Sequence, residues 1–275
     1  EFEQAFAEFV GVRHAIAVSS CTAGLHLANR AIGIDPGDEV ICPSLTFVAG
    51  ANSILYCGAQ PVFADIVSEY DLTVSIDSIR KRITPQTKAI QVMHYGGWMC
   101  QMNAILELAN EYGLPVIEDA AHAPGAQLQG QKSGTWGDIG CFSFFSNKNM
   151  TTGEGGMLVT NDDALAQQLR LMRSHGMTTL TLDRHKGHAF SYDVVTEGYN
   201  YRIDEIRSAI GLVQLKKLPQ SLKQREYLYQ VYLKNLKLVE KILLPFSDHA
   251  CQSAYHIFPI LLRDDIDRNA FMQFL

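Results

Sequence analysis

Short apolar runs alternate with helical stretches between about His14 and Asn161, and this alternation limits the possible folds more than any other feature of the chain. Such an order is typical of a doubly wound α/β fold, in which a mainly parallel sheet is covered by helices on both faces. The predicted strands are Ala15–Ser19, Glu39–Cys42, Pro61–Ala64, Ala89–His94, Pro115–Asp119, Ile139–Phe144 and Gly156–Thr160.

Helical patterns fill the intervals between these runs. Several of the helices begin with Ser, Thr or Asn at a position where the side chain can cap the helix. The predicted helices are Ala23–Ala31, Thr46–Cys57, Ser75–Lys81 and Met102–Tyr112.

The pattern changes after Asn161, where a helix over 162–175 and a loop to Asn200 lead into long amphipathic helices. Pro219 lies between two of these helices and is expected to open the second one. We therefore predict a large domain over 1–218 and the start of a smaller α/β domain over 219–275. In that second part, Tyr255–Leu262 is a predicted strand and a helix begins near Asp267. Helical patterns at both ends of the chain indicate that the natural protein continues on both sides.

Composition excludes several classes of function. The net charge is −6, and no basic block is longer than three residues, which argues against binding to nucleic acid or an anionic membrane. The six cysteines form no Cys-x-x-Cys pair, and no apolar run approaches the roughly 18 residues of a membrane span. We therefore expect a cytoplasmic protein. His185 and His188 are spaced like metal ligands but lack a third partner nearby, so no metal site is predicted.

The first candidate site is the segment Ser19-Ser-Cys-Thr-Ala-Gly-Leu25, where a strand end leads through small residues into a helix. The first turn of a helix has free N–H groups and the positive end of the helix dipole, so it can bind a phosphate. The Thr22 hydroxyl would be a further donor. An ordinary helix with a Ser or Thr cap has the same pattern, so both interpretations stay open at this point.

The second candidate site is Val116-Ile-Glu-Asp-Ala-Ala-His122, where an apolar strand carries Asp119 at its C-terminal end. Open α/β sheets bind ligands at that edge. A buried aspartate there can keep the ring nitrogen of a pyridine cofactor protonated. An aspartate at a strand end is equally typical of a turn or a helix cap.

The third candidate is the most informative, because Lys148 follows an apolar strand directly and precedes a Thr/Gly-rich turn and a further strand. A solvated charge on a loop does not explain this context. An enclosed amine has a lowered pKa and can act as a nucleophile and a proton carrier. The hydroxyls of Ser143 and Ser146 can contact a phosphate.

At these segments the chain resembles the DegT/DnrJ/EryC1/StrS sugar aminotransferases, which depend on pyridoxal 5′-phosphate (PLP). The resemblance extends from about Glu3 to Leu218 and implies the PLP-dependent transferase fold type I. That fold has a mainly parallel seven-stranded sheet between helices and a smaller C-terminal α/β domain, which would be incomplete here. The other matching motifs are Pro36-Gly-Asp-Glu-Val40, Pro43-Ser-Leu-Thr-Phe47, Gly58-Ala-Gln-Pro-Val-Phe-Ala-Asp65, His94-Tyr-Gly-Gly97, Arg173-Ser-His-Gly176 and Gly198-Tyr-Asn-Tyr-Arg202.

The resemblance implies a role for each matching residue. Lys148 would hold PLP as a Schiff base, and Asp119 would pair with the pyridine nitrogen, which makes these two the expected catalytic residues. Phe47 would stack on the cofactor ring, and His122 would lie near that ring.

The phosphate of PLP would be bound at Cys21, Thr22 and Ser143. The family usually has glycine at the position of Cys21, but a contact through the backbone N–H tolerates a small side chain. Asn200 falls where the family reaches the phosphate of the neighbouring subunit. The resemblance therefore implies a homodimer with shared active sites.

The implied reaction moves an amino group from L-glutamate or glutamine to a keto-sugar, in nucleotide-linked form, for amino-sugar or surface polysaccharide biosynthesis. Some relatives have histidine in place of the lysine and catalyse dehydration, so Lys148 favours transamination. A PLP-dependent dehydratase or lyase and a non-catalytic regulatory protein on the same fold remain alternatives. An NAD-binding protein is disfavoured, because no Gly-x-Gly-x-x-Gly follows the first strand.

Overall fold

A seven-stranded sheet with the order β1-β11-β10-β7-β6-β2-β3 forms the centre of the computed structural model, which describes residues 1–178 and 193–275. All strands except β11 run in one direction, so their carboxyl ends meet at one edge. The predicted mainly parallel sheet is confirmed. Its strands are β1 (His14–Val18), β2 (Glu39–Pro43), β3 (Gln60–Ala64), β6 (Thr87–Met93), β7 (Val116–Asp119), β10 (Ile139–Ser143) and β11 (Gly156–Thr160).

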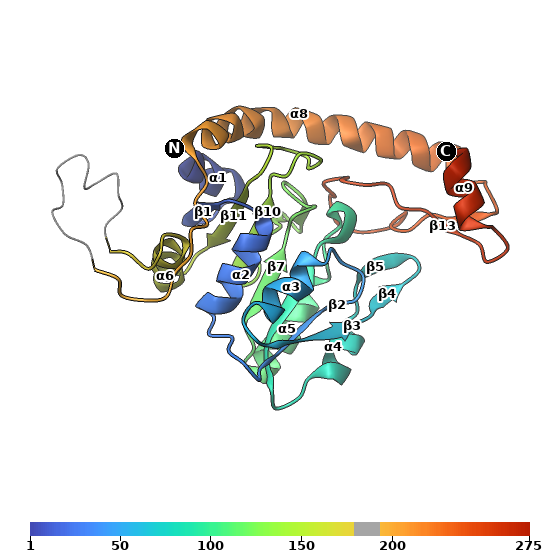
Figure 1. Cartoon of the computed structure of the whole chain (residues 1–275). Coiled ribbons are helices and arrows are strands. Elements are labelled where there is room, and N and C mark those ends of the chain that lie inside the picture. The colour runs from blue at the N-terminus through green and yellow to red at the C-terminus, as the bar shows by residue number, and fades with distance from the viewer. Residues whose placement is uncertain (179–192) are drawn as a thin grey trace.

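Helices cover both faces of this sheet (Figure 1). Those of the first part of the chain form where the sequence predicts them, because each places apolar side chains at helical spacing against the sheet. They are α1 (Phe2–Val10), α2 (Cys21–Ala31), α3 (Ala49–Leu55), α4 (Ile76–Arg82), α5 (Met102–Tyr112) and α6 (Asp163–Arg173).

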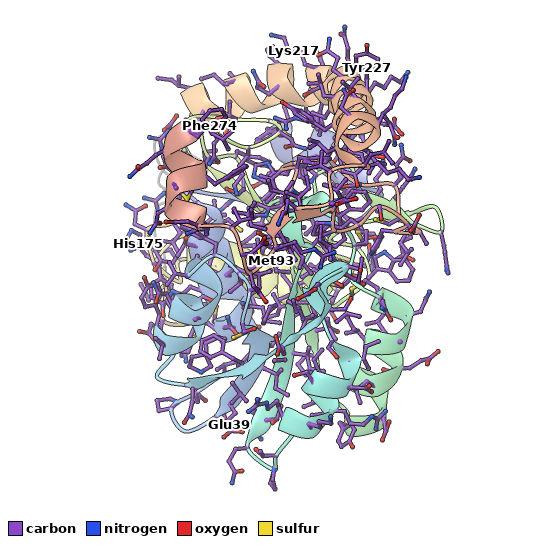
Figure 2. The ribbon with its side chains drawn as sticks, turned by 90° about the vertical axis from the view of Figure 1, so that its right-hand side faces the viewer. Glu39, Met93, His175, Lys217, Tyr227 and Phe274 are labelled. Atoms are coloured by element: carbon purple, nitrogen blue, oxygen red, sulfur yellow. The ribbon has the colours of Figure 1, made fainter. Side chains whose placement is uncertain are left out.

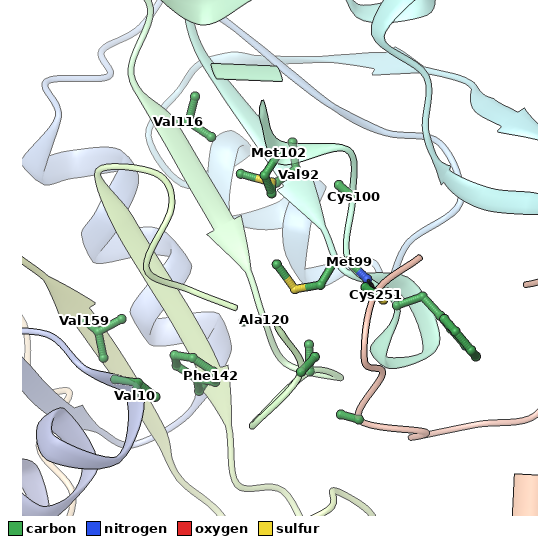
Figure 3. Close-up of a cluster of buried hydrophobic side chains, with 14 of the residues drawn as sticks. Val10, Val92, Met99, Cys100, Met102, Val116, Ala120, Phe142, Val159 and Cys251 are labelled. Atoms are coloured by element: carbon green, nitrogen blue, oxygen red, sulfur yellow. Dashed lines mark hydrogen bonds between the residues drawn. The ribbon is translucent and has the colours of Figure 1, made fainter. Parts of the chain in front are cut away.

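Alternate residues of a strand point to different faces of the sheet, and both faces are packed. Ala15 and Ala17 of β1 belong to a core with α1 and α5, whereas Ile16 and Val18 belong to a core with α2 and α6. Figure 3 shows part of the first core, where Phe142 lies near Val10 and Val159. Burial on both faces explains why Ala15–Val18 of β1 is a continuous apolar run.

Short elements connect or flank the sheet and were not predicted, because two to four residues give too little periodicity to detect. Two antiparallel hairpins and a single 3₁₀ turn belong to this group. They are β4 (Ile66–Ser68) with β5 (Asp71–Val74), β8 (Gln127–Leu128) with β9 (Gln131–Lys132), and η1 (Tyr95–Gly97).

The expected break at Pro219 is wrong, because one helix, α8 (Glu205–Leu236), continues through the proline. Figure 2 labels Lys217 and Tyr227 of this helix, one on each side of Pro219. Proline removes one helical hydrogen bond, but Leu215 and Leu218 are buried before it and Tyr229 after it. This packing holds both halves in one helix. The division into 1–218 and 219–275 stays a prediction.

The predicted strand Tyr255–Leu262 is wrong over most of its length. Only Leu261–Leu262 (β13) forms a strand, paired with β12 (Ile242–Leu243). The reason is tertiary: the N–H groups of Ala254 and His256 donate to carbonyls of the η1 turn, and Tyr255 has a φ of 49°, which no strand allows. The predicted final helix is present as α9 (Arg268–Phe274), with the side chain of Asp267 as its cap.

The described residues include no helix that is both long and apolar enough to cross a membrane. All six cysteines are buried thiols. His185 and His188 lie outside the described residues, as does most of the loop that contains them.

Candidate active site

The carboxyl edge of the sheet brings the predicted site residues together. Asp119 ends β7 and lies opposite Cys141 of the neighbouring strand β10. Ser143, two residues further along β10, is opposite Gly156, and Gly156 is in turn opposite Val18 at the end of β1. The chain then enters α2 directly after β1. The sheet therefore places Asp119, Ser143 and the start of α2 along one edge.

The turn into α2 packs against the sheet through backbone atoms. Ser20 caps the helix by accepting the N–H of Ala23 at 3.1 Å. A Cβ on Gly156 would lie 2.6 Å from the carbonyl carbon of Ser20 and 2.7 Å from the nitrogen of Cys21. Only glycine allows so close an approach. Both Cys21 and Thr22 therefore lie in the first turn of a capped helix, the position that can bind a phosphate.

Cys21 links this turn to Asp119, because its Sγ lies 4.0 Å from Asp119 Oδ1. Burial, together with the nearby carboxylate of Asp119, raises the pKa of the Cys21 thiol well above its ordinary value. The thiol therefore stays protonated and is a poor nucleophile.

Asp119 is a buried carboxylate, 3% exposed, with one oxygen that no described residue contacts through a hydrogen bond. Oδ1 accepts the N–H of Ala121 at 3.0 Å. Burial raises the pKa of Asp119, and the Ala121 N–H and the charge of Lys148 oppose this shift. Oδ2 therefore has no donor among the described residues. A protonated ring nitrogen would supply it with both a hydrogen bond and a positive charge.

Lys148 lies in the turn after β10 and is half-buried. Its backbone N–H donates to Phe145, but Nζ donates to no acceptor within 1–178 or 193–275. Burial lowers the pKa of Lys148, whereas Asp119 and Cys21 act in the opposite direction. The amine is thereby more readily neutral, as a nucleophile or a general base requires.

His122 and Phe47 lie at the same edge. His122 Nδ1 accepts the N–H of Gly96 at 3.3 Å, so the proton of the neutral ring is on Nε2. Burial, with the charges of Lys148 and His256, lowers the pKa of His122 to about 2. Phe47 is 64% exposed, and the hydroxyl of its neighbour Thr46 lies 3.0 Å from the sulfur of Met93 at the end of β6.

Ser143 and Asn200 keep side-chain groups available. Ser143 Oγ accepts the N–H of Phe145 at 3.4 Å, which leaves the hydroxyl proton able to donate. Asn200 is exposed, and its side chain forms no hydrogen bond with the part of the chain that the structure describes. The next residue, Tyr201, accepts the N–H of Ser19 through its carbonyl. This bond connects the segment of Asn200 to the chain just before α2.

The sequence analysis assigns no role to Glu118, which precedes Asp119 in β7 and forms several hydrogen bonds beneath the site. It is completely buried and accepts four hydrogen bonds of 2.7–2.8 Å. The sequence does contain a signal for Glu118, namely a charged residue next to the apolar residues of β7. A buried carboxylate needs several hydrogen-bond donors, so its neighbours could have been expected to supply them. The donors are His94 Nε2 and the N–H groups of Gly134, Trp136 and Gly137.

Asn149 and His256 were also missed. They come together from positions 107 residues apart, at a distance of 3.0 Å between His256 Nδ1 and Asn149 Oδ1. No local pattern predicts such a contact, because it depends on the course of the C-terminal segment.

We expect Asp119→Asn to stabilise the protein when no ligand has been added. When the pKa of a carboxyl is higher in the folded state than in the unfolded state, the group destabilises the fold. The cost is zero at low pH, where both states are protonated, and is complete above the folded-state pKa. The amide carries no charge, so it removes this cost, and it still accepts the N–H of Ala121. Urea unfolding from pH 4 to pH 8 measures the effect, and the advantage of the variant should grow as the pH rises. Asp264→Asn is the control, because Asp264 is exposed and forms no ion pair with a described residue. A difference that does not change with pH would contradict the assigned cause.

Comparison with known proteins identifies relatives over the entire length of the chain. The family described as the DegT/DnrJ/EryC1/StrS aminotransferase family matches residues 1–275. The chain is 46% identical over 261 residues to the GDP-perosamine synthase of Caulobacter vibrioides, covering 94% of this chain and 66% of the synthase. It is 42% identical over 259 residues to the spore coat polysaccharide biosynthesis protein SpsC of Bacillus subtilis, again covering 94% of this chain and 66% of the relative.

Among solved structures, PseC of Helicobacter pylori, an aminotransferase involved in the biosynthesis of pseudoaminic acid, aligns with a TM-score of 0.89 and 33% identity. The alignment covers 96% of this chain and 69% of PseC. The chain thus spans about two thirds of the length of these proteins. The sheet and its covering helices form the same fold as the aligned part of PseC.

Proposed function

Because the chain belongs to the DegT/DnrJ/EryC1/StrS aminotransferase family, we propose that it is a PLP-dependent aminotransferase acting on a nucleotide-linked keto-sugar. The observation that carries this proposal is the combination of two groups at one sheet edge. One is the buried carboxylate of Asp119, whose Oδ2 accepts no hydrogen bond from a described residue, and the other is the half-buried amine of Lys148.

The residues at this edge fit PLP. The capped first turn of α2, with Cys21 and Thr22, suits the phosphate, and the Ser143 hydroxyl can add a bond. Asp119 Oδ2 can accept from the pyridine nitrogen, and Lys148 would hold the cofactor covalently. When bound, PLP supplies an electron sink for the carbanion formed at the carbon that loses its proton.

Three side chains act beside the cofactor. The amino donor is L-glutamate or glutamine. Lys148 Nζ, with its lowered pKa, would take the proton from Cα of this donor and deliver it to the cofactor carbon that keeps the amino group. The reverse transfer gives the amino group and a proton to the keto carbon of the sugar, and the keto oxygen leaves as water. Asp119 keeps the pyridine nitrogen protonated in both halves. The exposed ring of Phe47 can stack on the cofactor and exclude water from that face.

The name of one relative, a GDP-perosamine synthase, supports a nucleotide-linked sugar as the acceptor. The name of another, a spore coat polysaccharide biosynthesis protein, supports a role in surface polysaccharide formation. We infer that the acceptor is a keto-sugar, because only a carbonyl carbon can receive the amino group in this chemistry.

We also propose a homodimer in which Asn200 serves the phosphate site of the partner subunit. Asn200 is exposed and without a hydrogen bond to any described residue, as a side chain that reaches another subunit must be. Large apolar side chains are exposed at the two ends of α3, as is typical of a surface that binds another protein. They are Phe47, Val48, Leu55 and Tyr56. The six unpaired thiols support a reducing, cytoplasmic location.

The visible absorption spectrum of the purified protein tests the reaction. After PLP is added, a band of covalently bound cofactor should form. L-glutamate should convert this band to the pyridoxamine form, and 2-oxoglutarate should restore it. A bound cofactor whose band neither glutamate nor glutamine changes would favour the dehydratase or lyase. The absence of any band would refute the cofactor assignment.

A further inference from the structure

His256 reaches the candidate active site from the C-terminal segment. Its ring centroid lies 4.3 Å from that of His122, and the two ring planes differ by 33°. Its Nδ1 lies 3.0 Å from Oδ1 of Asn149, the residue after Lys148. One side chain thus contacts both a residue expected beside the cofactor ring and the turn that carries the lysine.

The neighbouring bonds determine where the proton of His256 lies. Asn149 Nδ2 donates to the carbonyl of Ala254 at 2.6 Å. Because a carbonyl can only accept, the amide nitrogen of Asn149 must face Ala254, and its oxygen must face His256. Nδ1 of His256 therefore carries the proton and donates it to Asn149. The interaction has one orientation, which restricts the imidazole to a single ring plane.

Backbone contacts hold His256 in place from two further elements. Its N–H donates to Gly96 at 2.9 Å, and its carbonyl accepts from Arg225 of α8 at 3.2 Å. Arg225 also donates to the carbonyl of Tyr255, whose φ of 49° is unusual for a residue with a Cβ. Gly96 in turn donates to His122. The η1 turn is therefore bonded to both histidines.

Charge also favours this arrangement. Burial, together with the charges of Lys148 and Arg225, lowers the pKa of His256 to about 4, so the ring is neutral at pH 7. A neutral ring can pack against the neutral ring of His122 without repulsion from the lysine.

We propose that His256 is a positioning residue of the active site, which fixes the plane of the His122 ring and, through Asn149, the turn that carries Lys148. This inference rests on the proposed function, because His122 is expected beside the ring of PLP. His256 touches neither the reacting atoms nor the substrate in this role. Removing it should loosen the packing of the cofactor ring without removing any group that reacts.

Three variants separate the two contacts of His256. His256→Ala removes the ring and the hydrogen bond, and His256→Phe keeps a ring but cannot donate to Asn149. Asn149→Ala keeps the ring of His256 and removes its acceptor, together with the bond from Asn149 to Ala254. The readouts are the dissociation constant of PLP, from absorbance titration, and the visible circular dichroism per bound PLP, which reports how the ring is held. We expect His256→Ala to weaken PLP binding about 3- to 10-fold, in line with the loss of an aromatic pair, and to reduce the dichroism. His256→Phe should weaken binding less.

His249→Ala is the matched control. His249 belongs to the same part of the chain and packs on Trp98, with ring centroids 5.5 Å apart, so its loss loosens that region without touching His122. It should leave PLP affinity and dichroism unchanged. Wild-type affinity and dichroism in folded His256→Ala would overturn the proposal. If His256→Ala does not fold, His256→Phe decides: unchanged dichroism would overturn it. Failure of the wild type to bind PLP would instead refute the proposed function itself.

Discussion

Lys148→Ala is expected to lower amino transfer by at least about 10³-fold, because one substitution removes both the nucleophile that holds PLP and the base that moves the proton. The visible band of covalently bound cofactor should disappear at the same time. The fold should remain, since Nζ of Lys148 forms no hydrogen bond within the described ranges and its burial already opposes its charge. Steady-state kinetics and absorbance of the purified variant with PLP measure both effects.

Lys148→Arg is the matched control, since arginine keeps the positive charge but stays protonated and cannot act as a nucleophile or a base. It should be as inactive as the alanine variant. A surface substitution, Lys241→Ala, should leave activity unchanged. If either Lys148 variant kept the covalent band and most of the activity, another lysine would have to hold the cofactor.

Glu118→Gln should be the most damaging conservative change to stability, with a loss of roughly 3–5 kcal/mol in the free energy of unfolding. The carboxylate accepts four hydrogen bonds and donates none. In glutamine, an NH₂ group replaces one of the two carboxylate oxygens. Its two protons would face groups that already donate, so at least one buried donor loses its acceptor. The loss is a large fraction of the 5–15 kcal/mol that stabilises a typical domain.

Urea unfolding monitored by circular dichroism measures this loss. Glu111→Gln is the control, because Glu111 bonds at the surface to Arg80 and should matter little. A stability change at Glu118 no larger than that at Glu111 would mean that the donors find other acceptors. Because Glu118 precedes Asp119 in β7, the partly destabilised variant should also bind PLP more weakly.

Most of the sheet could be predicted from the sequence because its strands, except the edge strand β3, are buried on both faces. In β1 the segment Ala15–Val18 has no polar residue, and in β10 the segment Ile139–Phe142 has none before Ser143. Lys148 and Asp119 could be predicted as candidate site residues because Asp119 ends one strand and Lys148 lies shortly after another. Strand ends determine position in a parallel sheet.

The errors and omissions have a common cause in long-range contacts. Pro219 indicates a helix end by local rules, but buried Leu218 and Tyr229 hold the helix together across it. The apolar run from Tyr255 reads as a strand, yet the carbonyls of the η1 turn accept its N–H groups first. His256 could not be identified because its partners, His122 and Asn149, are far away in the sequence.

The continuity of α8 has a consequence for exchanging parts between relatives. A chimera joined at residues 218 and 219 would cut one helix between its two anchoring regions, Leu215 near one end and Arg225 near the segment of His256. The two pieces would come from different sequences, yet they would have to continue a single helical register and place Arg225 correctly. A crossover after Leu236 keeps the helix whole, although it separates Arg225 from the carbonyls that it binds. Recombination within this family should therefore treat α8 and the segment to His256 as one inherited block.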